Sequence, residues 1–301
     1  KKINNYTDNM EARDIETTIS GDTSFSVATI PKKTDIEDAM EKYADSKIVE
    51  YVQPNYIYKI SDDVVSETDN SEEPSISTEP AVNEDPSTGT EPAVNENPSA
   101  STEQAASDEA AAEGAASIDF YFDKQSWYFD AIDADGARAL IDEKNAALSK
   151  VKIAVIDTGA YMDHEDLKGR FDEGDSVDLI NGTLESPAKL YGDKHGHGTH
   201  VSGIIGATVD DKGVAGVATY VLGNENVEMI AIGVCNSAGY TTTDLIARGM
   251  EYAKSRNVNV INISLGGDGG DPTLDNECTA CAETGITVVT AAGNENTDTA
   301  C

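Results

Sequence analysis

Three of the chain's four histidines lie close together in one short stretch. The segment DKHGHGTHVSG, residues 193–203, contains His195, His197 and His200. Histidines at this density serve as metal ligands, as a catalytic base or as structural residues. A zinc site would take its acidic fourth ligand from Asp157 or Asp163, because no cysteine is nearby. The histidines alone therefore leave all three interpretations open.

Polar residues also follow the apolar runs that flank this stretch. Asp157 comes directly after KIAVI, and Asn294 lies near the end of GITVVTAAGNEN. Glycines on both sides of His197 leave little bulk, so a helix start there can approach a neighbouring strand. In parallel sheets the chemistry lies at the carboxyl ends of strands, which here are Asp157, Ser264 and Asn294. An amide such as Asn294 could donate a hydrogen bond to a developing oxyanion.

The elements that must position these residues alternate along the chain. Nearly continuous apolar runs predict buried strands at 152–157, 229–234, 258–264 and 286–290. Helical patterns lie between them, at 201–207, 243–254 and 273–283. Strands alternating with helices predict an α/β fold with a parallel sheet.

We expect three segments of different character. Residues 118–301 form the large domain. Residues 62–117 carry fifteen Asp or Glu, no Lys or Arg, and the heptapeptide TEPAVNE twice. This composition predicts an acidic, disordered linker, with an acidic calcium-binding tail as the alternative. Residues 1–61 predict a small α+β unit, with a strand at 24–30, a helix from Thr34 to about Tyr43, and a strand or strand pair within 48–60.

The composition excludes several classes of partner. The formal net charge is -35, which disfavours nucleic acid and anionic membrane surfaces. No apolar run approaches the roughly 18 residues that a membrane-spanning helix needs. The chain begins KKINNYTDNM, without an apolar signal core, so we expect that a signal peptide was removed or that upstream sequence is missing.

Four motifs in order resemble the subtilisin-like serine proteases, or subtilases. They are DTG at 157–159, HGTHVSG at 197–203, VINISLGG at 260–267 and TAAGNEN at 290–296. The resemblance covers about 175 residues from Val151 onward, and it implies an α/β peptidase domain. It implies that Asp157 orients the imidazole of His197, that His197 acts as general base and then general acid, and that Asn294 donates to the oxyanion. By the same resemblance His195, His200 and His164 are structural or loop residues.

The resemblance also implies how a protein or peptide substrate would bind. Ser264, Leu265 and Gly266 would pair with extended substrate and form one wall of the main specificity pocket. Ala291, Ala292 and Gly293 would form the other wall, open to fairly large apolar side chains. Gly239, Tyr240 and Thr241 would be the facing edge strand.

Subtilases often hold a structural calcium ion beside the catalytic helix. The corresponding loop here is TVDDKGV, residues 208–214. The implied oxygen ligands are Gln125, Asp166, Thr208, Asp210, Lys212 and Val214, an arrangement suited to a hard cation. No organic cofactor is expected, and an ion-free turn is the alternative.

The small amino-terminal unit fits the resemblance too. The segment VEYVQPNYIYKI, residues 49–60, resembles the end of subtilase propeptides, which fold the catalytic domain and then inhibit it. We expect the chain to begin inside this propeptide, because residues 1–23 look too short and too polar to supply its first strand and helix. The resemblance implies a secreted zymogen with an extracellular location.

The serine that completes the Asp-His-Ser catalytic triad of subtilases has no counterpart in this sequence. Subtilases place it in a GTSMA-like turn after the oxyanion asparagine, and only ENTDTAC follows Asn294 here. We expect a chain cut before its nucleophile, with the remainder absent or on a separate chain, and no triad activity for residues 1–301 alone. The alternative is a non-catalytic relative that acts as a binding or inhibitory protein.

Overall fold

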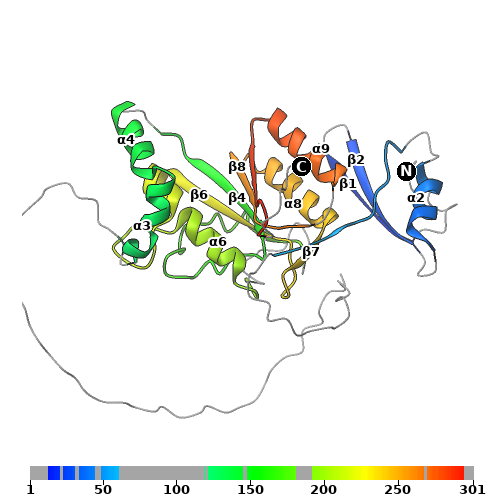
Figure 1. Ribbon diagram of the computed structural model, residues 1–301, viewed down its shortest axis with the longest axis horizontal. Coiled ribbons are helices and arrows are strands. Elements are labelled where there is room, and N and C mark those ends of the chain that lie inside the picture. Colours follow the sequence, from blue (N-terminus) through cyan, green and yellow to red (C-terminus); the bar gives the residue numbers. More distant parts are fainter. Residues whose placement is uncertain are drawn as a thin grey trace, which may run out of the picture.

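The computed structural model describes residues 13–20, 23–30, 34–44, 49–60, 119, 121–144, 148–180, 192–267 and 270–294. The linker predicted at 62–117 lies outside the described residues. The core is a five-stranded parallel sheet in the order β5-β6-β4-β8-β9 (Figure 1). Its strands are β4 (Val151–Asp157), β5 (Val177–Asp178), β6 (Val227–Gly233), β8 (Val260–Ile263) and β9 (Thr287–Thr290). The predicted α/β fold is therefore confirmed.

Helices cover both faces of this sheet. Alternating residues of β4 face opposite layers, with Ile153 in one apolar cluster and Ile156 in the other. The layer beside Ile153 includes α6 (His197–Gly206) and α7 (Val217–Leu222), and the layer beside Ile156 includes α8 (Thr243–Ser255) and α9 (Pro272–Glu283). Burial on both faces explains the continuous apolar runs of β4 and β6, whereas β9, predicted as a buried strand, lies at the edge of the sheet and is largely exposed.

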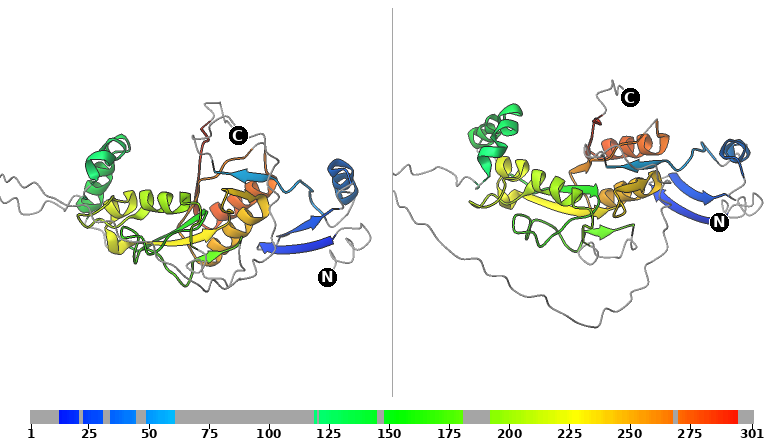
Figure 2. Two further views of the ribbon diagram at one scale, coloured as in Figure 1. Left: turned by 90° about the horizontal axis from the view of Figure 1, so that it is seen from below. Right: turned by 60° about the horizontal axis from the view of Figure 1, so that its bottom comes forward.

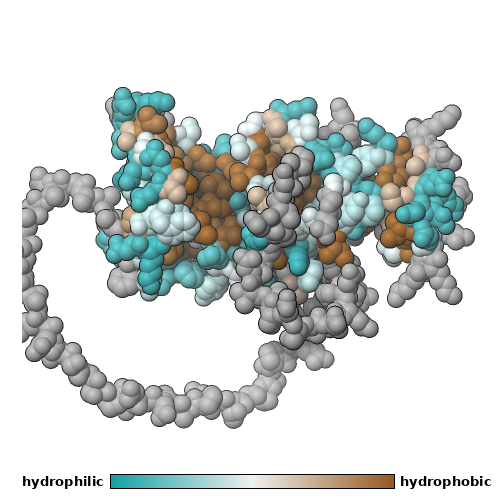
Figure 3. Space-filling view, in the orientation of Figure 1, coloured by the Kyte–Doolittle hydropathy of each residue, from teal (hydrophilic) through white to brown (hydrophobic). Residues whose placement is uncertain are grey.

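Two helices lead into the sheet where the sequence pattern gave no element. They are α3 (Phe122–Ala131) and α4 (Ala134–Lys144), followed by β4. Phe122 of α3 stacks on Tyr220 of α7 with ring centroids 5.6 Å apart, and Phe129 meets the same ring edge-on at 5.0 Å. In the space-filling view, apolar residues gather between α4 and α8, over the central strands (Figure 3).

The helix of the HGTHVSG motif starts earlier than its apolar pattern suggests. We expected residues 201–207, and α6 runs from His197 because Gly196, at φ 98°, turns the chain into the helix. The predicted helices at 243–254 and 273–283 correspond to α8 and α9. Asp271 accepts hydrogen bonds from the first N–H groups of α9, and Pro272 occupies its first position.

The amino-terminal part contains one more strand than expected. Strand β1 (Arg13–Ser20) pairs antiparallel with β2 (Thr23–Thr29), although residues 1–23 looked too polar for a strand. Helix α2 (Ile36–Ala44) follows, and the side chain of Asp35 caps it. Within the described residues 49–60, β3 (Ile57–Lys59) is the strand, and it pairs with β7 (Tyr240–Thr242) (Figure 2).

Candidate active site

Asp157 and His197 form a direct pair at the carboxyl end of the sheet. Nδ1 of His197 lies 2.8 Å from Oδ1 and 3.0 Å from Oδ2 of Asp157. Asp157 is the last residue of β4, and its side chain is fully buried. His197 is the first residue of α6, and its side chain is 20% exposed. A buried carboxylate that accepts from Nδ1 fixes the ring orientation and leaves Nε2 to exchange protons, which suits a general base.

Close packing brings these two elements together. A Cβ atom built on Gly198 would lie 2.2 Å from the carbonyl oxygen of Gly159 and 3.1 Å from Cβ of Asp157. Only glycine lets the start of α6 rest on the turn that follows β4. The N–H of Gly198 donates to Oγ1 of Thr158 at 2.9 Å, and the N–H of Thr158 donates to Asp157 at 2.7 Å. The pair is therefore held by backbone contacts on both sides.

Asp193 anchors the loop that leads into α6, a role that we did not predict. Its Oδ1 accepts the N–H groups of His195 and Gly196, and its Oδ2 accepts the N–H and the hydroxyl of Thr199. Burial alone would raise the pKa of Asp193, but the hydrogen bonds from Thr199 and Gly196 lower it overall. The available signal was an aspartate just before a helix that starts with glycines.

The other histidines do not converge on one point. His195 lies beside the catalytic candidate, with ring centroids 6.3 Å apart, and its Nε2 lies next to Gly239. His200 is exposed on α6, so it does not pack as a structural residue. Nδ1 of His164 accepts the N–H of Asp166 at 3.2 Å. Among the described residues, no group of three or more His, Cys, Asp or Glu side chains is arranged to hold a metal ion.

The predicted substrate-binding segments lie on the two sides of β3. Lys59 exchanges two backbone hydrogen bonds with Gly266, each 3.0 Å long, and the N–H of Ile60 donates to the carbonyl of Gly239 at 3.0 Å. On the other edge, β3 pairs with β7 in the register Tyr58–Thr241. The structure thus brings Gly239–Thr241 and Ser264–Gly266 together around an extended segment of the same chain.

The remaining predicted residues follow the last strand of the sheet. Ala291, Ala292, Gly293 and Asn294 come directly after β9, and all four are exposed. The N–H of Ala291 donates to the carbonyl of Ile263 at 3.2 Å, which continues the pairing with β8. The oxyanion and pocket roles of these residues remain predictions.

Two of the predicted calcium ligands lie against the loop at 208–214. Oδ2 of Asp166 accepts the N–H of Val214 at 3.1 Å, and its carbonyl accepts the N–H of Thr208 at 2.8 Å. Gln125 exchanges two hydrogen bonds with the backbone of Ala215, at 2.9 and 3.0 Å. Both side chains therefore hold the loop through its backbone.

A further carboxylate at this loop was not predicted. Oδ1 of Asp119 accepts the N–H of Asp210 at 2.8 Å, and its Oδ2 is buried with no hydrogen-bond partner among the described groups. Burial raises the pKa of Asp119, and the N–H groups of the loop offset this only in part. The side chain of Asp210 itself is 39% exposed and pairs with Lys212. A buried carboxylate oxygen that accepts no hydrogen bond is the kind of ligand that a hard cation takes. The oxygen ligands available at this loop are therefore of the type that calcium prefers.

Cys235 is a second residue near the pair that the sequence did not single out. It is 3% exposed, and its N–H lies 3.3 Å from the carbonyl of Asp157. Burial raises the pKa of this thiol, and the charges of Asp157 and Asp193 raise it further. A thiol that keeps its proton is a poor nucleophile, so Cys235 is not suited to nucleophilic chemistry.

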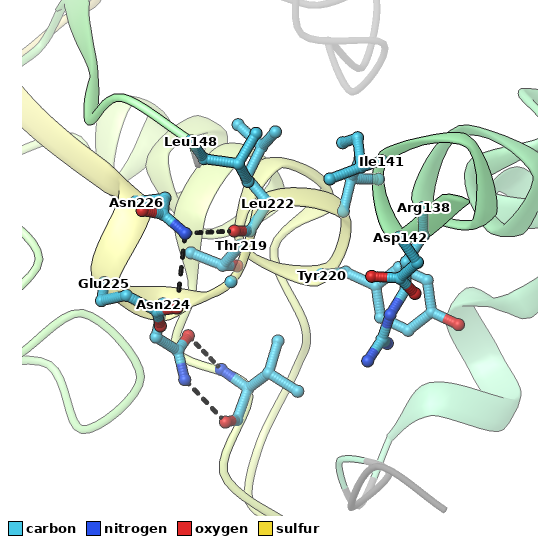
Figure 4. Close-up of a pocket in the computed structure, with 13 residues that line it drawn as sticks. Arg138, Ile141, Asp142, Leu148, Thr219, Tyr220, Leu222, Asn224, Glu225 and Asn226 are labelled. Atoms are coloured by element: carbon cyan, nitrogen blue, oxygen red, sulfur yellow. Dashed lines mark hydrogen bonds between the residues drawn. The ribbon is translucent and has the colours of Figure 1, made fainter. Parts of the chain in front are cut away.

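A groove also lies near the amino ends of the strands, at the end of the sheet away from Asp157. It encloses about 580 Å³ between α4 and α7 and is lined by residues that include Arg138, Tyr220, Asn224 and Glu225 (Figure 4). Asn226 lies at the start of β6, and Val227 is in register with Val151 at the start of β4. The groove therefore faces the amino ends of the strands, away from Asp157.

Among the described residues, every helix is too short or too polar to traverse a lipid bilayer.

Comparison with known proteins gives matches that are confined to the large domain. The model of the subtilase family matches residues 149–300. An intracellular serine protease of Paenibacillus polymyxa is 38% identical over 145 residues, which cover 48% of this chain and 42% of that protein. Subtilisin DY of Bacillus licheniformis is 38% identical over 147 residues, 48% of each protein. Subtilisin E of Bacillus subtilis (strain 168) is 39% identical over 147 residues, 49% of this chain and 35% of that protein. The chain thus spans less than half the length of these relatives.

Proposed function

The chain belongs to the subtilase family, and on that premise we propose that it carries the aspartate and the histidine of a serine endopeptidase triad. The observation that supports this most directly is the contact between Nδ1 of His197 and the buried carboxylate of Asp157 at 2.8 Å. The nucleophilic serine would be supplied by residues outside this sequence.

The proposed mechanism assigns one step to each polar group. Asp157 keeps Nδ1 of His197 protonated and stabilises the imidazolium that forms during the reaction. His197 removes the serine proton through Nε2 and returns it to the leaving amine. Asn294 donates its side-chain amide to the oxyanion of the tetrahedral intermediate.

Substrates would be proteins or peptides bound in extended form. The backbone pairing of β3 with β7 and with Gly266 supports this, because any extended peptide offers the same N–H and carbonyl groups. Ser264–Gly266 and Ala291–Gly293 would form the two walls of the main pocket.

We further propose that residues 1–61 act as an internal inhibitor of the zymogen. The position of β3 between the two predicted substrate-binding segments supports this role. An extracellular location is also proposed, on the basis of the family alone. An extracellular location is not shared by all of the relatives, since one of them is named an intracellular serine protease.

A structural calcium ion is the last part of the proposal. Asp119 and Asp166, together with backbone carbonyls of the loop at 208–214, would hold it and would pin that loop beside α6. Removing the ion with EDTA is then expected to lower the unfolding temperature of the chain, and added calcium should restore it. An unfolding temperature that is insensitive to both would indicate an ion-free turn.

The decisive experiment uses the full reading frame in which this sequence lies. A fluorophosphonate probe should label one serine, and labelling should disappear in His197→Ala. Activity should fall by about 10⁴-fold or more, as for other triad members. If the full protein is folded and is neither labelled nor active, the chain is a non-catalytic relative that binds or inhibits.

A further inference from the structure

The side chain of Tyr58 occupies a defined pocket in the cleft. Its ring lies on the backbone of Gly267, where an added Cβ would come within 2.4 Å of the ring carbon Cδ1. Its hydroxyl donates to Oδ2 of Asp271 at 2.9 Å. Gly267 thus provides a flat floor for an aromatic ring, and Asp271 provides an acceptor at the far end.

Asp271 is a built acceptor rather than a surface charge. It is 6% exposed, and its Oδ1 accepts the N–H groups of Thr273 and Leu274 at the start of α9. Its Oδ2 accepts the hydroxyl of Thr243 at 2.6 Å as well as that of Tyr58. Gln53, on the same segment as Tyr58, donates to Oδ1 at 2.7 Å as well. Burial alone would raise the pKa of Asp271, but the hydrogen bonds from Thr243, Gln53 and Tyr58 lower it overall. The hydroxyl of Thr243 and the N–H groups of α9 orient the carboxylate independently of the segment that contains Tyr58.

The backbone around Tyr58 is hydrogen-bonded on both edges, as the backbone of a bound extended peptide would be. Tyr58 is in register with Thr241 of β7, and the next residue, Lys59, exchanges two hydrogen bonds with Gly266. These contacts use only N–H and carbonyl groups, so they fix the position of any extended peptide. The residue that aligns with Tyr58 would place its side chain over Gly267 toward Asp271.

We propose that this pocket selects a tyrosine side chain in the substrate and that Asp271 is the residue that determines the selection. The inference rests on the proposed peptidase function and names a preference of that site. Phenylalanine would fill the same space but would leave the buried carboxylate without its phenol donor. Hydrogen bonds to charged groups are strong, so the expected preference for tyrosine over phenylalanine is about 10- to 100-fold.

Other side chains suit the pocket less well. An acidic side chain would be repelled by Asp271. A lysine could pair with the carboxylate, but its flexible chain would not cover the flat floor at Gly267 as a ring does. The charge of Asp271 is moreover already met by the N–H groups at the start of α9.

The first test measures peptide cleavage by the full-length enzyme after its amino-terminal segment has been released from the cleft. Peptides that follow the sequence 55–60, with tyrosine, phenylalanine, leucine or lysine at position 58, would be compared by kcat/KM. The wild type should prefer tyrosine over phenylalanine by about 10- to 100-fold, mainly through KM. In Asp271→Ser this ratio should fall to about 1, because serine still caps α9 but is too short to reach the phenol. The matched control is Asp275→Ser, which changes an exposed acid on the same helix and should keep the ratio.

The second test does not depend on catalysis. Tyr58→Phe, Asp271→Ser and the double variant of the intact chain would be compared in a double-mutant cycle of unfolding by urea. We expect the two substitutions to be coupled by about 10-fold or more in the equilibrium constant of unfolding. Coupling without cleavage of any peptide would support the pocket and refute the peptidase proposal. No coupling, an unchanged ratio in Asp271→Ser, or a preference for lysine would overturn the pocket.

Discussion

Replacing Gly198 with alanine should separate His197 from Asp157 without touching either residue. The new methyl carbon would lie 2.2 Å from the carbonyl oxygen of Gly159. Since carbon–oxygen contacts are about 3.3 Å or longer, the start of α6 must move by about 1 Å. The neighbouring atom belongs to the backbone and cannot rotate away.

The size of the effect follows from that shift. A displacement of about 1 Å would stretch the 2.8 Å contact between Nδ1 of His197 and Oδ1 of Asp157 beyond hydrogen-bond range. We expect Gly198→Ala to lower the activity of the full-length enzyme by about 100-fold, the usual cost of such a misplacement. The overpacking should also lower the free energy of unfolding by about 1–3 kcal/mol.

The same substitution five residues later provides the control. Gly203 lies in the same helix, and a Cβ added there meets nothing within 4 Å. Gly203→Ala should therefore stabilise the chain by about 0.5–1 kcal/mol through helix propensity and leave activity unchanged. Urea unfolding and peptidase assays on both variants give the comparison. If Gly198→Ala matches the wild type in both, close packing does not position the pair and the reasoning fails.

Three further predictions concern buried groups. Arg170 is 8% exposed and donates to three backbone carbonyls, so Arg170→Met should lower the free energy of unfolding in urea by about 3 kcal/mol, whereas an effect below about 1 kcal/mol would contradict this account. Asp193 has a lowered pKa in the folded chain, so its stabilisation is complete above about pH 4 and is lost as the pH falls further. Thermal unfolding between pH 2 and 6 should thus decline less steeply for Asp193→Asn than for the wild type, and equal slopes would refute the assignment. The raised pKa and burial of Cys235 predict that a thiol reagent at pH 8 labels it only in urea, as mass spectrometry of digested protein would show.

Periodicity was enough to predict four of the five strands of the sheet and the helices α8 and α9, but not β5. The strands β4 and β6 are buried along most of their length, and such burial produces their apolar runs, whereas β9 at the edge of the sheet is largely exposed although its run is apolar. The rule that chemistry lies at the carboxyl ends of parallel strands pointed to Asp157. Its pairing with His197 was implied by the resemblance to the subtilases, and the two side chains are in contact in the structure.

The contacts that support the site could not be predicted in the same way. Asp193, Asp119 and Asp271 are three of the chain's many acidic residues, and only the fold shows that their carboxylates accept backbone N–H groups. Helix α3 was missed because aromatic packing against Tyr220 of α7 stabilises it more than an amphipathic pattern does, and α4 was missed because it contacts α7 through Arg138, whose guanidinium lies 5.1 Å from the centre of the Tyr220 ring. Strand β1 was missed because pairing with β2 outweighs the polarity of its sequence.

The tethering of β3 has a consequence for dilution. If the segment inhibits as proposed, it would compete with substrate at an effective concentration on the order of 1 mM, whatever the concentration of the protein, because β3 and β7 belong to one chain. A single cut between β3 and α3 would change no contact in the cleft, yet it would turn this first-order equilibrium into a second-order one. The cleaved segment would then dissociate when the protein is at nanomolar concentration and rebind when the protein is concentrated. Peptidase activity would therefore begin only after the protein has been diluted.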